Sequence, residues 1–186
     1  MKSTLFSFAI VPLLIFIKCS DGSNAILFST RDIDLPWRTV IASEKERGER
    51  LIVSGTVFAA NGEIPLEGVK LYVYHTDVYG RYNNHSGSSS DPRLFAYLRT
   101  NREGRYEFET IKPGPYPTGG TPAHIHYVLS MPEAEEQRFE IFFEGDRFLS
   151  DATRARAERG EAMIMRPERG QDDILRGNCD ITFHAQ

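Results

Sequence analysis

The chain has 186 residues, of which 40% are hydrophobic and 26% are charged, and its formal net charge is −4. These values are typical of a single globular domain that can bury a sizeable core, and they differ from those of disordered chains. No basic cluster is present among the 22 lysine and arginine residues, so the chain is not expected to bind nucleic acid.

The first twenty residues have the character of a targeting segment. Lys2 precedes an apolar run over residues 5–17, and small and polar residues follow it. This pattern is typical of a secretory signal peptide, so residues 1–20 predict a secreted, extracellular protein. The run is too short to cross a bilayer comfortably, and no stable membrane insertion is expected. Two alternatives stay open, namely lipid attachment at Cys19 and burial of the segment as a strand or helix.

The cysteines do not suggest a disulfide framework. Cys19 and Cys179 are the two cysteines of the chain, and removal of the leader would leave Cys179 alone. The fold is therefore expected to depend on its core, although a bridge between the two stays open if Cys19 is retained.

Residues 21–49 show no clear period and end in a charged stretch, so they are predicted to form an N-terminal extension. Residues 50–186 are predicted to form one all-β domain, a sandwich or a barrel, with glycine-, proline- and asparagine-rich turns between short strands. Its C-terminal part, 146–178, is expected to be loop or one short helix, with a last strand at 179–184. The other predicted strands are 51–58, 68–76, 94–100, 104–111, 123–130 and 138–145.

Two histidines alternate within the stretch TPAHIHY. His124 and His126 would point to the same face of a strand, where both imidazoles could reach one metal ion. A pair of histidines with ordinary hydrogen bonds on a strand is the alternative. Tyr82, at the end of a Gly-Arg-Tyr turn, and Tyr116, inside Pro-Gly-Pro-Tyr-Pro, occupy loop positions that are typical of functional side chains.

This set of residue types favours one metal. A bound cation stabilises phenolate strongly, and two phenolates balance two of the three charges of ferric iron. Zinc sites usually consist of histidine, cysteine and carboxylate, and ferrous oxygenases usually have two histidines and one carboxylate. Two tyrosines with two histidines therefore predict Fe(III) as the cofactor.

Several blocks of the chain, in consistent order, resemble the intradiol ring-cleavage dioxygenases, the family of catechol and protocatechuate dioxygenases. The blocks are GTVFAANGEIPLEGVKLYVYHTDVYGRY, LRTNREGRYEFETIKPGPYP, TPAHIHY and FFEGD. The resemblance implies a β-sandwich of mostly antiparallel strands with long loops. It also implies one non-haem Fe(III) ion and cleavage of a small aromatic diol with O2 to a muconate-type diacid.

The resemblance assigns a role to each candidate residue. Tyr82, Tyr116, His124 and His126 match the metal ligands. Tyr116 also matches the catalytic tyrosine that leaves the metal when a catechol binds.

At two further catalytic positions the chain departs from the family. Thr121 stands three residues before the first histidine, where relatives usually have arginine, and Glu140 stands where glutamine is common. Both changes should make the pocket more negative, unless Arg81 or Arg93 supplies the missing cation. The shorter loop between Tyr116 and His124 implies a more open pocket.

Three functions are compatible with these features. The first is a secreted ferric dioxygenase that acts on catechols. The second is a transthyretin-like or immunoglobulin-like sandwich that binds a partner without catalysis. The third is a homologue that keeps iron but has lost or changed its activity through Thr121 and Glu140.

Overall fold

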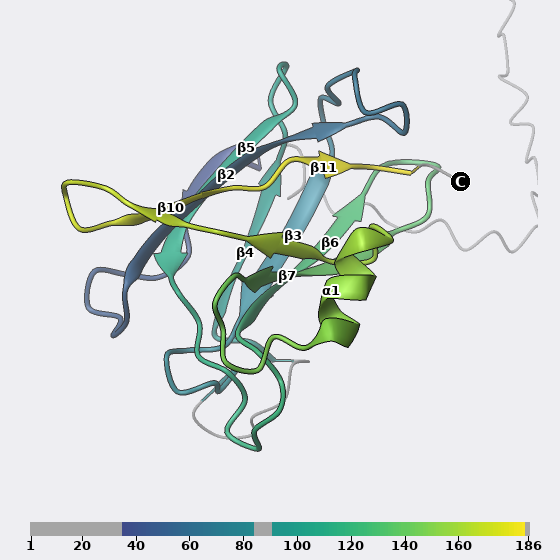
Figure 1. Cartoon of the computed structure of the whole chain (residues 1–186). Coiled ribbons are helices and arrows are strands. Elements are labelled where there is room, and N and C mark those ends of the chain that lie inside the picture. Colours follow the sequence, from purple (N-terminus) through teal and green to yellow (C-terminus); the bar gives the residue numbers. More distant parts are fainter. Residues whose placement is uncertain (1–34, 84–90, 185–186) are drawn as a thin grey trace, which may run out of the picture. The chain divides into compact units, whose positions relative to one another are not determined.

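Two β-sheets pack face to face around one core (Figure 1). The computed structural model describes residues 35–83 and 91–184, which belong to the unit that spans residues 33–186. The predicted signal peptide, Cys19 and the beginning of the predicted extension lie outside the described residues. The elements are β1 Arg38–Val40, β2 Arg50–Phe58, β3 Lys70–His75, β4 Leu94–Arg99, β5 Arg105–Ile111, β6 His124–Ser130, β7 Gln137–Phe143, α1 Asp151–Glu158, β8 Met163–Met165, β9 Glu168–Arg169, β10 Leu175–Asn178 and β11 Ile181–Thr182.

The first sheet has the strand order β1-β5-β2-β10-β9, with β11 also paired to β2, and the second has the order β4-β3-β6-β7-β8. The central pairs β2–β5, β3–β4, β3–β6 and β6–β7 are antiparallel. Parallel pairs occur where β1, β8, β10 and β11 join the sheets. The all-β sandwich predicted from the sequence is confirmed.

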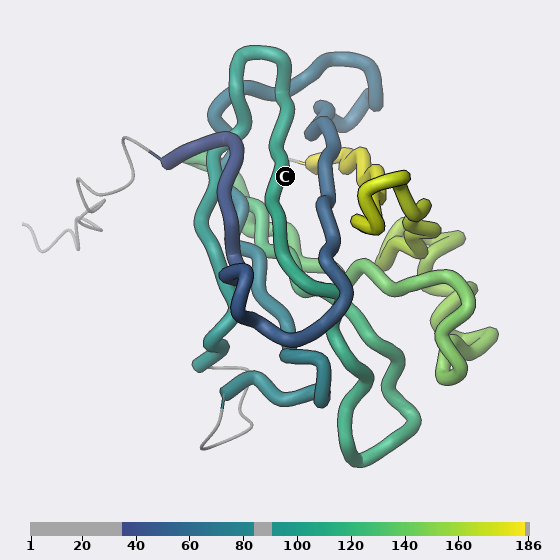
Figure 2. Tube along the Cα trace, turned by 90° about the vertical axis from the view of Figure 1, so that its left-hand side faces the viewer, coloured from purple at the N-terminus to yellow at the C-terminus, as the bar shows by residue number. Residues whose placement is uncertain are grey.

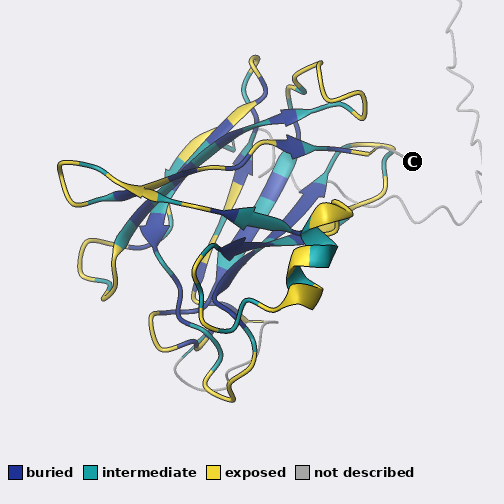
Figure 3. Cartoon of the chain, viewed as in Figure 1, coloured by how far each residue is buried: buried dark blue, intermediate teal, exposed yellow. Residues whose placement is uncertain are grey.

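The strands are amphipathic because alternate residues point to opposite faces of a sheet. Along β2 and β3, buried residues alternate strictly with half-buried ones (Figure 3). Aliphatic and aromatic side chains from both inner faces form the core, as hydrophobic burial requires. Its fully buried members include Leu51, Val53, Leu71, Val73, Leu98, Tyr106, Phe108, Ile125, Tyr127, Leu129, Ile141 and Phe143.

The sequence did not indicate four of the short strands. β1 lies before the predicted domain boundary at residue 50 and pairs with β5, and β8, β9 and β10 lie in the predicted loop or helix region. Each has at most four residues, and so short a segment does not show the alternation of apolar and polar residues by which a strand is recognised in a sequence. The predicted short helix is α1, which begins after the capping side chain of Ser150. No helix in the described part of the chain is long and apolar enough to span a membrane.

One buried histidine links the two sheets. His75, at the end of β3, is completely buried, and its Nε2 lies 2.7 Å from Oγ1 of Thr110 on β5. Its Nδ1 lies 2.7 Å from the carbonyl oxygen of Thr76. Burial lowers the pKa of His75 to about 4 from its usual value of 6.5. The imidazole is therefore neutral in the folded protein at pH 6, where the unfolded chain would already bind a proton.

Acidification should therefore destabilise the fold through His75. The unfolded state binds the proton below pH 6.5 and the folded state only near pH 4, so stability is lost as the pH falls through this window. The shift corresponds to about 3 kcal/mol of unfolding free energy by pH 4. Urea unfolding at pH 7, 5.5 and 4 should show a smaller loss for His75→Gln than for the wild type. Equal losses in both proteins would contradict this role.

Candidate metal centre

Two loops at one end of the sandwich carry the candidate tyrosines. Tyr82 follows β3 and Tyr116 follows β5, and the two loops lie at the lower end in Figure 1 and in the rotated view of Figure 2. The backbone N–H of Gly114 donates to the carbonyl oxygen of Asp77 at 2.9 Å, so the loops are bonded to each other. The hydroxyl of Thr76 also donates to the carbonyl oxygen of Gly114, at 3.0 Å.

Asp77 shapes the loop that carries Tyr82. Its Oδ1 accepts hydrogen bonds from the backbone N–H groups of Tyr79 at 2.9 Å and of Arg81 at 3.0 Å. Such bonds from an aspartate to the following backbone are typical of tight turns. The turn ends at Tyr82, whose side chain is buried.

The candidate histidines lie on β6, with both side chains on the face of the second sheet that points away from the core. They alternate with the core residue Ile125, as the strand period requires. Asp146 fixes the start of this strand, because its Oδ2 accepts from the backbone N–H of Ala123 at 3.0 Å. The predicted strand 138–145 ends earlier, at Phe143, because Gly145 turns the chain with a φ of +82°.

The four candidate ligands converge at their polar tips. Oη of Tyr82 contacts Oη of Tyr116 and lies 2.7 Å from Nε2 of His126. Nε2 of His124 lies 3.0 Å from Nε2 of His126 and 3.3 Å from Oη of Tyr116. Two loops and one strand thus bring together four residues that are up to 44 positions apart in the chain.

Two neighbours hold the imidazoles in place. Nδ1 of His124 lies 2.8 Å from the carbonyl oxygen of Pro122, which makes Nδ1 the protonated nitrogen and leaves the lone pair of Nε2 toward the cluster. The ring of Tyr74 stacks on the ring of His126, with centroids 4.5 Å apart and planes inclined by 12°. The histidine that carries the 2.7 Å contact to Tyr82 is therefore packed along its face.

Burial favours the neutral form of every group in the cluster. It lowers the pKa of His126 to about 4, with a further contribution from His124, and it lowers the pKa of His124 as well. It also raises the pKa of the Tyr82 and Tyr116 phenols. Neutral imidazoles are ready to bind a metal at neutral pH, whereas the phenols need a cation to ionise.

A metal ion fits this donor set. Ligand atoms that bind one ion at about 2 Å lie about 3 Å from each other, which agrees with the observed contacts of 2.7 to 3.3 Å between His124, His126 and their tyrosine neighbours. Within the described residues, no group of three or more His, Cys, Asp or Glu side chains could hold a metal. The donors that the cluster offers are thus two nitrogen and two phenol oxygen atoms, a set that differs from those typical of zinc and of ferrous iron.

The remaining predicted site residues lie around the cluster in different settings. Thr121 is half-buried in the turn before β6. Glu140, on β7, pairs in register with His126, but its carboxylate accepts a hydrogen bond from Arg156 on α1 at 2.6 Å. This ion pair offsets part of the negative charge of Glu140, which still acts on the cluster: burial lowers the pKa of His126, and the charge of Glu140 opposes that effect. Arg156 also lies over the ring of Phe142, 5.9 Å from its centroid.

Arg93 does not supply the missing cation. Its guanidinium binds the carboxylate of Glu46 at 2.5 Å and lies 3.9 Å from that of Asp77. Arg156 is an arginine whose charge does act on the cluster. Burial lowers the pKa of His124, and the charge of Arg156 lowers it further. The sequence showed no signal for Arg156, since it reaches Glu140 only because α1, the element after β7, folds back against that strand.

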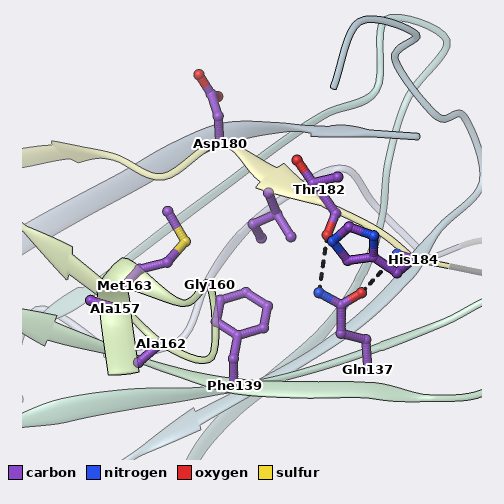
Figure 4. Close-up of a pocket in the computed structure, with 10 residues that line it drawn as sticks. Gln137, Phe139, Ala157, Gly160, Ala162, Met163, Asp180, Thr182 and His184 are labelled. Atoms are coloured by element: carbon purple, nitrogen blue, oxygen red, sulfur yellow. Dashed lines mark hydrogen bonds between the residues drawn. The ribbon is translucent and has the colours of Figure 1, made fainter. Parts of the chain in front are cut away.

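A separate cavity of about 330 Å³ lies between β7, the end of α1 and the C-terminal segment (Figure 4). None of the four converging side chains lines it. The amide of Gln137 donates there to the carbonyl oxygen of Thr182 at 3.0 Å and accepts from the backbone N–H of His184 at 2.9 Å. This cavity is therefore distinct from the metal centre.

Known proteins of similar sequence include catechol and protocatechuate dioxygenases. Catechol 1,2-dioxygenase 2 of Acinetobacter lwoffii is 31% identical over 120 residues, which are 56% of this chain and 43% of that protein. The protocatechuate 3,4-dioxygenase beta chain of Burkholderia cepacia is 34% identical over 103 residues, 50% of this chain and 43% of that one. The chain thus spans less than half the length of these relatives.

Solved structures show the same fold, and a family model covers most of the chain. The dioxygenase domain of a dioxygenase carbohydrate-binding protein fusion from Streptomyces sp. SirexAA-E has a TM-score of 0.63 at 23% identity, over 90% of this chain and 98% of that one. 3-Chlorocatechol 1,2-dioxygenase of Rhodococcus opacus 1CP has a TM-score of 0.66 at 23% identity, over 80% of this chain and 65% of that one. The family model described as Dioxygenase matches residues 34–181. The chain belongs to the intradiol ring-cleavage dioxygenase family.

Proposed function

We propose that this protein is a ferric intradiol dioxygenase that cleaves catechol-type rings with O2 to muconate-type diacids. The observation that carries the proposal is the convergence of two phenol oxygens and two imidazole nitrogens within hydrogen-bonding distance of each other. The proposed iron ligands are Tyr82, Tyr116, His124 and His126. Bound ferric iron would supply the Lewis acidity and redox chemistry that activate the catechol toward O2.

The two tyrosines differ in a way that suggests different roles. Tyr82 is buried, contacts His126 and belongs to the turn that Asp77 fixes, so we propose it as the permanent ligand. Tyr116 is half-buried in the other loop, and its contact with His124 is longer at 3.3 Å. Burial raises the pKa of Tyr116, so a phenolate at its Oη is basic enough to take a proton from a substrate hydroxyl.

The surroundings of the cluster favour catechols without a charged group on the ring. Thr121 leaves the turn before β6 without a cation, and the guanidinium of Arg156 is engaged with Glu140. A carboxylate on the ring would therefore meet no cation at position 121, and Glu140 would repel it. We also propose secretion, which rests on the leader-like sequence of residues 1–20.

A second candidate function is an iron protein with lost or altered activity. Thr121 favours it, because relatives usually have arginine at this position to stabilise the charge that develops on the substrate. Removal of one such group typically costs about 10² to 10³ in rate. A sandwich that only binds a partner would not need four metal donors at one point.

Metal content and turnover test these alternatives together. The purified protein should contain about one iron per chain, show a visible phenolate-to-iron absorption band, and take up O2 when catechol is added. The muconate product should form in equal amount to the O2 consumed. Iron and colour without O2 uptake would favour the second candidate, and zinc in place of iron would contradict both.

A further inference from the structure

The outer face of the second sheet carries aromatic side chains next to the metal centre. In the register of β4, β3 and β6, Tyr74 lies opposite Phe95 and His126, and Tyr72 lies opposite Tyr97 and Val128. All of these residues point to one face, because positions two apart on a strand share a face. Tyr72 and its neighbours Tyr97 and Val128 therefore lie two residues along the strands from Tyr74 and His126, on the same face of the sheet.

The aromatic rings form a continuous stack that ends at the cluster. The ring of Tyr97 stacks on Tyr72 with centroids 4.7 Å apart, and Tyr72 stacks on Tyr74 at 5.1 Å. Tyr74 in turn stacks on His126 at 4.5 Å. Tyr97 and Phe95 are 43% and 47% exposed, so the far end of the stack is open to solvent.

A shallow groove of about 250 Å³ lies on this face. Tyr72, Tyr97 and Val128 line its floor, and Lys70 and Arg138 stand at its rim. Burial raises the pKa of Tyr72 to about 12, so its ring is a neutral phenol. The carboxylate of Glu136 engages Arg138 at 2.6 Å, which reduces the positive charge at the rim. The ammonium of Lys70 lies over the ring of Tyr97, 5.0 Å from its centroid, and both faces of Tyr72 contact other rings. The floor therefore offers the edges of these rings to a flat group.

We propose that Tyr72 and Tyr97 form an aromatic subsite, against whose ring edges a second aromatic ring of the substrate packs, so that two-ring catechols bind better than catechol itself. The position of the first ring rests on the proposed function. Successive residues on one face of a strand are about 7 Å apart, so the subsite lies about one ring-and-linker length from His126. An edge-to-face contact between two aromatic rings is favourable at centroid distances of about 4.5 to 7 Å.

Anaerobic calorimetry on the full-length protein tests the subsite without turnover, with catechol and 3,4-dihydroxystilbene as ligands. The wild type should bind the stilbene about tenfold more tightly, which is the effect of one edge-to-face ring contact and its buried area. Tyr97→Leu should remove most of this preference and leave the Kd of catechol unchanged. Tyr72→Leu should do the same. Ile64→Ala, which shortens an exposed side chain outside the stack, should keep the preference.

Equal affinity of the wild type for both ligands would overturn the subsite, and so would an undiminished preference in Tyr97→Leu. Because Tyr97 is largely exposed, its replacement should not disturb folding, and circular dichroism verifies this. O2 uptake is then measured with the same two ligands. Absence of uptake with either one would contradict the proposed function, whereas the binding preference alone decides the subsite.

Discussion

His126→Ala should lose iron and O2 uptake, whereas His184→Ala should retain both. Nε2 of His126 lies 2.7 Å from Oη of Tyr82 and 3.0 Å from Nε2 of His124. Its loss therefore removes the donor atom that contacts both a proposed ligand on a loop and the other proposed ligand on β6. Without the metal, burial keeps the Tyr82 phenol neutral, because it raises the pKa of that group. Changes to groups that only orient metal ligands cost about 10 to 100-fold in affinity, so loss of a ligand should cost at least about 100-fold.

Iron per chain, visible absorbance and O2 uptake with catechol are the measurements for this prediction. His184 is a suitable control because it is exposed on the C-terminal segment and lines a different cavity. Thermal unfolding of both variants shows whether the fold is intact. A His126→Ala protein that keeps its colour and its iron would exclude His126 as a ligand.

Gly80→Ala should separate the two tyrosine loops and prevent assembly of the metal centre. A Cβ at Gly80 would lie 2.0 Å from the carbonyl oxygen of Pro115, the residue before Tyr116. Backbone atoms cannot yield easily, so the loops must move apart. The φ of +77° adds strain for any residue with a Cβ. We expect a loss of about 3 kcal/mol or more in stability, with steric overpacking as the larger part, and iron binding reduced at least about tenfold.

Gly119→Ala is a matched control for this change. Gly119 has the same φ of +77° and lies in the Tyr116 loop, but a Cβ there would have no atom within 4 Å. It should show only the conformational cost of about 1 kcal/mol. Urea unfolding and iron content measure both variants. Equal effects of the two substitutions would mean that the contact between Gly80 and Pro115 does not hold the loops together.

Local sequence patterns were sufficient for the central strands. The alternation of apolar residues along β2 and β3 is visible in the sequence, and turn residues such as Asn61 and Gly62 mark the ends of strands. β1 and β10 could not be predicted in this way. They are short, and they gain their stability by parallel pairing with β5 and β2, which are far away in the chain.

The candidate site, too, could be predicted from the sequence only in part. The spacing of His124 and His126 already requires a common face on a strand, and the rigid loop around Tyr116 singles out that tyrosine. The loop position of Tyr82 after a Gly-Arg turn singles it out in the same way, and the resemblance to a known family then assigns all four residues the role of metal ligands. The partner of Glu140 had no signal in the sequence, because Arg156 comes from a helix that touches β7 only after folding.

The sequence by itself therefore determined the residue types of the proposed metal centre, the period of the strands and the positions of the turns. These depend on the local geometry of the chain, which relates neighbours within a few residues. The tertiary structure decided that Tyr82 meets Tyr116 and that Tyr72 and Tyr97 continue the face of His126. It also decided that Arg156 pairs with Glu140. Contacts of this kind depend on which strands pair and in which register, and long-range packing sets that register.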